Sequence, residues 1–218
     1  MSELRRLFNK WNCDKGSKHN YEKCYEQFFE PLKDKEINIL EVGIYKGHSL
    51  KVFKDYFPNA QIYGIDIFTR VNPNTISTLF NKNIHWAKCD STDPSCASEI
   101  TKSFGKDIKF DIIIDDGLHE PEANALTLKN LWPLLKSDGI YFVEDVWPLD
   151  EMSTQDIEDR VWLNQQPEIY SNEKYNLFLK QLENKHVERF DLRKPSTSIG
   201  HVHEVGDSYI FKVTNIAR

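Results

Sequence analysis

Phe110-Asp111-Ile112-Ile113-Ile114-Asp115-Asp116-Gly117-Leu118-His119 is an apolar run that ends in two carboxylates and an imidazole. A second apolar run, Gly139-Ile140-Tyr141-Phe142-Val143, ends in Glu144-Asp145. Short apolar runs bounded by polar residues are typical of buried strands. The two runs therefore predict neighbouring strands that deliver acidic side chains and His119 to one edge of a sheet.

The surrounding sequence alternates between strand and helix patterns. Further strands are predicted at 37–43, 61–67 and 84–90, and helices at 49–57, 96–104 and 121–135. This alternation favours parallel pairing and an α/β sheet covered on both faces. Residues 186–193 and 208–214 alternate as an antiparallel pair at the sheet edge would. We expect a Rossmann-like, doubly wound sheet of about seven strands that ends in this pair.

Two flanking regions differ from this core pattern. Residues 1–36 carry apolar side chains at helical spacing and predict a short N-terminal helical segment that packs on the core. Residues 37–218 then form the main domain. Within it, the polar residues 150–182 predict helices that act as a lid or a dimer insertion. A homo-oligomer could form through this insertion and the N-terminal helices.

The composition disfavours several classes of function. The chain has 218 residues, of which 39% are hydrophobic, and a formal net charge of −6. It lacks the basic footprint of a nucleic-acid binder, and no apolar run approaches the roughly 18 residues that cross a bilayer. The first six residues lack the apolar core of a signal peptide, so we expect a cytoplasmic protein. None of the four cysteines forms a C-x-x-C pair, which disfavours a structural zinc site.

Residues 41–49 follow a predicted strand and open a predicted helix. Their glycines, Gly43 and Gly47, permit tight turns and close backbone approach to a ligand. Asp66 ends the next strand, where an acidic side chain can accept hydrogen bonds from a ribose diol. Asp90 and Ser91 end the third strand and could contact an adenine edge. Each of these interpretations has an alternative. Residues 41–49 could form an ordinary strand-to-helix turn, Asp66 could cap a helix or lie in an exposed turn, and Asp90 and Ser91 could lie in a solvated turn.

The acidic strand ends predict a divalent-metal site with a base beside it. Mg²⁺ prefers oxygen ligands, and a metal there would stabilise the alkoxide of a substrate hydroxyl. His119 has an ordinary pKa near neutrality and could accept the proton. The alternative is that Asp115 and Asp116 cap the following helix and that His119 only packs. Trp147 could stack on an acceptor sugar or simply belong to the core.

The chain resembles class I S-adenosylmethionine-dependent methyltransferases, whose first motif is E/D-x-G-x-x-x-G and whose second is an acidic residue after strand two. Asp-Asp-Gly-Leu-His with the later Glu-Asp-Val resembles, within them, the metal-dependent sugar O-methyltransferases of the mycinamicin group. Asp14-Lys15-Gly16-Ser17-Lys18-His19-Asn20-Tyr21 resembles their D-K-x-x-x-H-x-Y entry, which folds over the cofactor site. Leu118 and Val146 replace the family's Ser and Leu.

The resemblance implies an O-methyltransferase that uses S-adenosylmethionine and Mg²⁺ or a similar ion on a hydroxylated small molecule. The acceptor would be a sugar or glycosylated compound, such as a natural product or surface-polysaccharide precursor, and neither nucleic acid nor membrane would be a partner. The expected base is His119, and the expected metal ligands are Asp116, Glu144 and Asp145. The expected cofactor-binding residues are Glu41, Gly43, Gly47, Ser49, Asp66, Asp90, Ser91, Asp115, Asp14, His19 and Tyr21.

Three other functions fit parts of this pattern. A catechol-type metal-dependent methyltransferase keeps the fold and takes two adjacent hydroxyls as ligands. A non-catalytic domain could bind the nucleoside cofactor as a sensor. NAD binding is disfavoured because the middle glycine of G-x-G-x-x-G is missing.

Overall fold

The computed structural model describes residues 1–158, 160–192 and 208–216. Its strands form one seven-stranded sheet in the order β3-β2-β1-β4-β5-β7-β6. The strands are β1 (Asn38–Val42), β2 (Gln61–Asp66), β3 (Ile84–Lys88), β4 (Phe110–Asp115), β5 (Leu135–Val143), β6 (Lys185–Asp191) and β7 (Tyr209–Asn215). The first five are parallel, and β7 runs antiparallel between β5 and β6. The predicted fold class is confirmed, although residue 193, the last of the predicted strand 186–193, lies outside the described residues.

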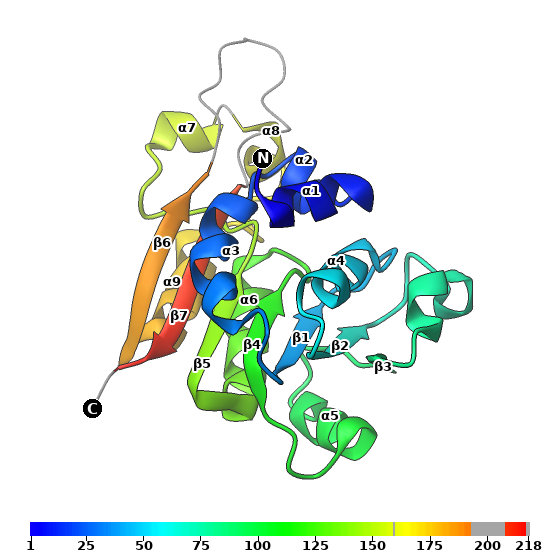
Figure 1. Ribbon diagram of the computed structural model, residues 1–218. Helices are drawn as coiled ribbons and strands as arrows, with labels where there is room; N and C mark the ends of the chain where they lie inside the picture. Colours follow the sequence, from blue (N-terminus) through cyan, green and yellow to red (C-terminus); the bar gives the residue numbers. More distant parts are fainter. Residues whose placement is uncertain (159, 193–207, 217–218) are drawn as a thin grey trace.

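Helices cover both faces of this sheet (Figure 1). The α-helices are α1 (Glu3–Lys10), α2 (Asp14–Ser17), α3 (Glu22–Phe29), α4 (His48–Tyr56), α5 (Cys96–Phe104), α6 (Pro121–Leu131), α7 (Thr154–Glu158), α8 (Val161–Asn164) and α9 (Asn172–Leu182). Short 3₁₀ turns are η1 (Glu30–Leu32), η2 (Pro73–Thr75), η3 (Ser77–Phe80) and η4 (Trp132–Leu134). Among the described residues, no helix combines the length and apolar character needed to span a membrane.

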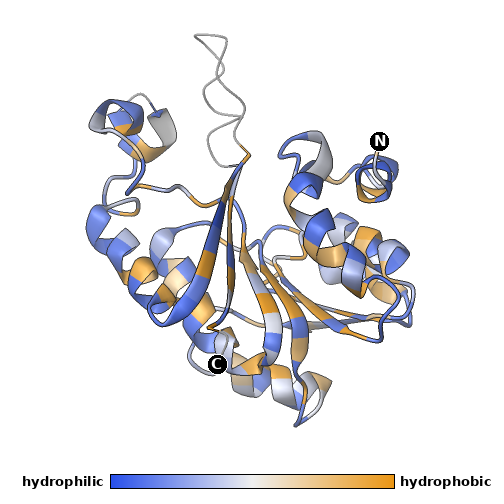
Figure 2. Ribbon diagram, turned by 60° about the vertical axis from the view of Figure 1, so that its left-hand side comes forward, coloured by the Kyte–Doolittle hydropathy of each residue, from blue (hydrophilic) through white to orange (hydrophobic). Residues whose placement is uncertain are grey.

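The strand periodicity divides the core into two clusters. Ile112 and Ile114 on β4 pack with side chains of α1, α3 and α4, whereas Ile113 packs with those of α5, α6 and α9. Successive side chains of a strand point to opposite faces, so a continuous apolar run is needed when both faces are covered. Figure 2 shows this arrangement, with helices on either side of the hydrophobic central strands.

The N-terminal segment packs directly on the sheet. Tyr25 and Phe29 of α3 are fully buried, and the Tyr25 ring lies edge-on to Phe142 of β5 at 4.9 Å. Phe29 also contacts Phe53 and Phe57, in and directly after α4. The division of the chain at residue 36 and the lid or dimer role of 150–182 stay predictions.

The sheet order fixes where a ligand can bind. The strand order reverses between β1 and β4, because β2 and β3 extend to one side of β1 and β5 to the other side of β4. In open α/β sheets, ligands bind outside the carboxyl ends of the strands at such a switch point. The carboxyl ends of β1, β4 and β5 therefore define the candidate site.

Candidate functional site

Backbone hydrogen bonds hold three strand ends together at the switch point. The Asp116 amide donates to the Val42 carbonyl at 3.1 Å, and the Glu144 amide donates to the Asp115 carbonyl at 2.9 Å. These bonds extend the β1–β4 and β4–β5 ladders by one residue each. The acidic residues after β4 and β5 consequently lie beside the turn that follows β1.

The turn after β1 requires glycine at two positions. Gly43 has φ +88°, and a Cβ there would collide with the Asp116 carbonyl oxygen. Gly47 has φ +73° and precedes α4, where a Cβ would lie 3.0 Å from Ile76. Both residues occupy the left-handed region that disfavours other side chains. The turn is therefore shaped to bring the backbone of β1 against the end of β4.

Acidic side chains organise this turn. Asp66 at the end of β2 accepts hydrogen bonds from the Ile44 and Tyr45 amides at 2.9 and 3.0 Å. Glu41 is fully buried in β1 and accepts a hydrogen bond from Ser49 Oγ at 2.5 Å. Burial raises the pKa of the Glu41 carboxyl to about 7. The structure thus brings together the five cofactor-site residues predicted on β1, the turn, α4 and β2.

Residues after β3 lie further along the same edge. Asp90 is exposed and accepts hydrogen bonds from the Thr92 amide at 2.9 Å and its hydroxyl at 2.7 Å. The Ser91 hydroxyl lies 2.8 Å from Thr127 Oγ1 on α6. Asp90 therefore bonds within its own loop, and Ser91 bonds α6. Among the described residues, neither forms a hydrogen bond with the glycine turn.

Asp115 and Asp116 are adjacent but have different partners. Asp115 is buried and accepts a hydrogen bond from Asn124 of α6 at 3.3 Å, and burial raises its pKa to about 6. Asp116 contacts His119 and Lys15. Neither caps α6, because its N-cap residue is Glu120. The capping alternative is not what the chain adopts.

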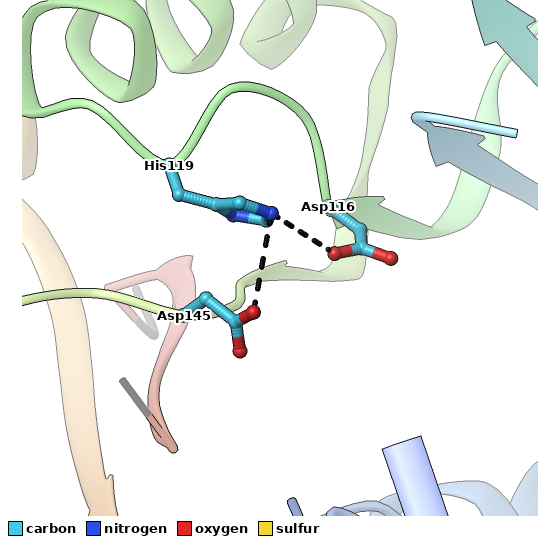
Figure 3. A group of neighbouring side chains, drawn as sticks. All are labelled: Asp116, His119 and Asp145. Atoms are coloured by element: carbon cyan, nitrogen blue, oxygen red, sulfur yellow. Dashed lines mark ion pairs between the residues drawn. The ribbon is translucent and has the colours of Figure 1, made fainter. Parts of the chain in front are cut away.

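Asp116, His119 and Asp145 form a compact group in which one ligand atom from each lies within 4.8 Å of the others. His119 Nε2 lies 3.5 Å from Asp116 Oδ1 and 3.9 Å from Asp145 Oδ2, and Figure 3 shows the imidazole facing both carboxylates. Burial favours the neutral imidazole, but Asp145 and Asp116 outweigh it and raise the pKa of His119. His119 Nδ1 is buried and makes no hydrogen bond with the described residues. Two carboxylates at this spacing suit a divalent cation, and the imidazole lies directly beside them.

Backbone strain marks the same group. His119 has φ +60° and Asp145 has φ +52°. A residue other than glycine in this region costs of order 1–3 kcal/mol and persists only where the surroundings hold it. The two side chains are therefore held in place at some cost in backbone energy.

Glu144 is buried and has a different environment from Asp145. Its Oε2 accepts a hydrogen bond from Lys15 Nζ at 2.5 Å, and its Oε1 accepts one from the Tyr25 hydroxyl. Burial raises the pKa of this carboxyl well above its usual range. The three predicted metal ligands therefore have two different environments. Asp116 and Asp145 lie beside His119, whereas Glu144 accepts hydrogen bonds from two side chains of the N-terminal segment.

Residues 12–21 contain the one-turn helix α2 and reach into the site. The Tyr21 hydroxyl donates to Asp145 Oδ1, and His19 Nδ1 lies 3.4 Å from the same oxygen and 2.9 Å from Ser208 Oγ. Asp14 stays exposed at the start of α2. Lys15 and Tyr25 were not predicted, although Lys15 stands inside the D-K-x-x-x-H-x-Y motif.

Trp147 follows the Glu-Asp pair but is buried. Its side chain belongs to the core cluster on the α6 and α9 face, and the Arg160 guanidinium lies 5.1 Å above its ring. Its contact with an acceptor stays a prediction.

Comparison with known proteins identifies the fold and its central domain. A family model described as a methyltransferase domain matches residues 40–146, which include the glycine turn and both acidic strand ends. The chain carries a methyltransferase domain. The predicted resemblance is therefore confirmed, and the domain spans β1 to the segment after β5.

Relatives of the methyltransferase domain include sugar-modifying enzymes. The chain is 32% identical to demethylmacrocin O-methyltransferase of Streptomyces fradiae over 150 residues, which cover 66% of this chain and 35% of that protein. It is 31% identical over 146 residues to 8-demethyl-8-alpha-L-rhamnosyl tetracenomycin-C 2′-O-methyltransferase of Streptomyces olivaceus, covering 62% and 36% respectively. The match thus spans about a third of the length of these relatives.

A solved structure extends the likeness beyond the domain. The mycinamycin-pathway methyltransferase MycE, in complex with Mg, SAH and mycinamycin VI, superposes with a TM-score of 0.63 at 22% identity. The superposition covers 98% of this chain and 54% of MycE. The shared architecture therefore includes the N-terminal helices and the closing antiparallel strands.

Proposed function

We propose that the chain is an S-adenosylmethionine-dependent O-methyltransferase that acts with a divalent cation on a sugar hydroxyl of a glycosylated small molecule. The observation that carries this proposal is the Asp116–His119–Asp145 group directly beside the glycine turn of a methyltransferase domain. The turn supplies a place for the cofactor and the group supplies a base and metal ligands. The sugar acceptor is supported by relatives such as the 8-demethyl-8-alpha-L-rhamnosyl tetracenomycin-C 2′-O-methyltransferase, whose name gives a rhamnosyl compound as the methyl acceptor.

The cofactor would lie along the carboxyl ends of β1, β2 and β3. Gly43 and Gly47 let the backbone approach its methionine end, with Glu41 and Ser49 beneath the turn. Asp66 would exchange its bonds to the turn for bonds to the ribose hydroxyls. We further propose Asp90, Ser91 and Asp115 for the adenine side. Residues 14–21, with His19 and Tyr21, would cover the methionine side.

The metal ligands would be Asp116 and Asp145, with Glu144 joining when it leaves Lys15. The donor chemistry fits Mg²⁺ or a similar cation, because carboxylate oxygens from two strand ends converge there. When bound, such an ion supplies positive charge that stabilises the alkoxide of the acceptor.

His119 would act as the base. Its imidazole takes the proton of the acceptor hydroxyl, and the oxygen attacks the methyl carbon of the sulfonium. The carbon–sulfur bond breaks with its electron pair passing to sulfur, which leaves S-adenosylhomocysteine. Asp145 and Asp116 favour the protonated imidazole, in agreement with the raised pKa of His119. The proton stays on His119 until the products leave.

Calorimetric titration of S-adenosylmethionine and S-adenosylhomocysteine, with and without Mg²⁺, tests the cofactor assignment. Micromolar binding of both is expected. Absence of binding under either condition would remove the methyltransferase proposal and leave a different nucleoside ligand to be found.

Turnover tests the acceptor and the base. Glycosylated polyketides, their aglycones and a simple catechol are incubated with S-adenosylmethionine and Mg²⁺, and products are identified by mass spectrometry. Methylation of the glycosides alone is expected; methylation of the catechol alone would favour catechol-type chemistry. His119→Ala should abolish turnover and leave cofactor binding intact. His85→Ala is the control, because His85 lies on the edge strand β3, where its side chain contacts Gln61 and Tyr63.

A further inference from the structure

Lys15 is a buried ammonium surrounded by carboxylates. The side chain is 2% exposed, and its Nζ lies 2.5 Å from Glu144 Oε2, 2.6 Å from Asp116 Oδ2 and 3.4 Å from Glu41 Oε1. The three acidic residues lie near the carboxyl ends of three different strands, Glu41 inside β1 and the other two directly after β4 and β5. A buried charge is stable only when opposite charges and hydrogen bonds surround it. Lys15 therefore places a positive charge among the carboxylates at this edge of the sheet.

The position of Lys15 Nζ resembles that of a metal ion. It contacts one oxygen from each of two strand-end carboxylates, Asp116 and Glu144, and these are two of the residues predicted to bind the metal. The other oxygen of Asp116 faces His119. Asp116 thus stands between the Lys15 ammonium and the Asp116–His119–Asp145 group. A divalent cation that recruits Glu144 must take the oxygen that Lys15 holds.

The N-terminal segment is tied to the same carboxylates through neutral groups. The Tyr25 hydroxyl donates to Glu144 and the Tyr21 hydroxyl donates to Asp145. These contacts carry no charge and do not compete electrostatically with a metal. Lys15 differs from the two tyrosines because its contact with Glu144 is an ion pair.

We propose that Lys15 is a built-in counter-cation that occupies the position between Asp116 and Glu144, and that a divalent cation binds there by displacing it. The proposal rests on the proposed function and concerns its metal site. Metal binding would move the Lys15 ammonium out of the carboxylates and loosen α2 from the sheet edge. The affinity for the metal would then be set by the competition between one ammonium and one divalent ion for the same oxygens.

The test compares the Mn²⁺ and Mg²⁺ affinities of the full chain and its variants by calorimetry. Lys15→Met keeps the apolar stem and removes the competing charge, so it should bind Mn²⁺ at least tenfold more tightly than the unaltered protein. Lys23→Met is the matched control, because Lys23 is an exposed cation on α3 of the same segment. Tyr25→Phe removes a hydrogen bond to Glu144 without changing charge and should give no increase in affinity.

A second measurement needs no variant. Lysines of the unaltered protein are acetylated with and without saturating Mg²⁺ and located by mass spectrometry. Lys15 should be protected without the metal and modified with it.

The outcomes separate the two proposals. Equal or weaker metal binding by a folded Lys15→Met variant, or continued protection of Lys15 in the metal-bound protein, would overturn the displacement and leave the metal site intact. Absence of metal binding by both proteins would refute the metal assignment as well.

Discussion

Phe29→Ala tests whether the N-terminal segment is part of the core on which the site depends. Phe29 of α3 is fully buried, and its ring centroid lies 4.6 Å from Tyr25, 5.2 Å from Phe57 and 5.9 Å from Phe142. Truncating a core phenylalanine to alanine costs about 3–5 kcal/mol, because the transfer free energy is lost and a cavity remains. For a chain of this size, that corresponds to a fall in Tm of roughly 6–20 °C.

Urea unfolding followed by circular dichroism measures the change in the free energy of unfolding. Phe80→Ala is the control, because the Phe80 ring is 73% exposed and exposed substitutions change stability by about 0.5 kcal/mol or less. A loss below about 1 kcal/mol for Phe29→Ala would mean that α3 contributes little to the core. The packing of the N-terminal segment on β5 and α4 would then be refuted.

Three further predictions concern the turn and the thiols. Gly43→Ala forces a side chain against the Asp116 carbonyl at a positive φ; urea unfolding should show a loss of at least about 2 kcal/mol, and unchanged stability would contradict the turn geometry. Asp66→Ala removes the acceptor for two turn amides; calorimetry should show S-adenosylmethionine binding weakened about 10- to 100-fold, and unaltered affinity would disprove its role. Burial raises the pKa of the Cys24 thiol, which is free in the structure. Iodoacetamide at pH 8 should label it only after unfolding, and rapid labelling of the folded protein would contradict its burial.

The fold could be predicted because each strand carries its own local signal. Ile112, Ile113 and Ile114 form a continuous apolar run, which only a strand covered on both faces requires. The glycine turn was visible for a similar reason: Gly43 and Gly47 follow a strand and precede a helix, where positive φ is needed. These signals involve residues close together in the sequence.

The ligand environment of Glu144 was not predictable in the same way. Its partner Lys15 lies 129 residues away, and no local periodicity links a one-turn helix to a strand end at that separation. Trp147 shows a second limit, because an aromatic residue after a strand can line a pocket or enter the core with the same sequence pattern. The different partners of Asp115 and Asp116 could have been predicted, because successive side chains at a strand end point to opposite faces.

The acidic edge and the N-terminal segment depend on each other energetically. Glu144 is buried with both carboxylate oxygens bound to Lys15 and Tyr25, and Asp145 is bound to Tyr21. A buried carboxylate without a cation or a hydrogen-bond donor costs several kcal/mol or takes up a proton. Glu144 therefore needs a positive charge beside it, which the Lys15 ammonium supplies in this structure and which a divalent cation would supply in its place. The helices before β1 thus complete the acidic edge of the sheet, because Lys15, Tyr21 and Tyr25 satisfy the carboxylates of Glu144 and Asp145.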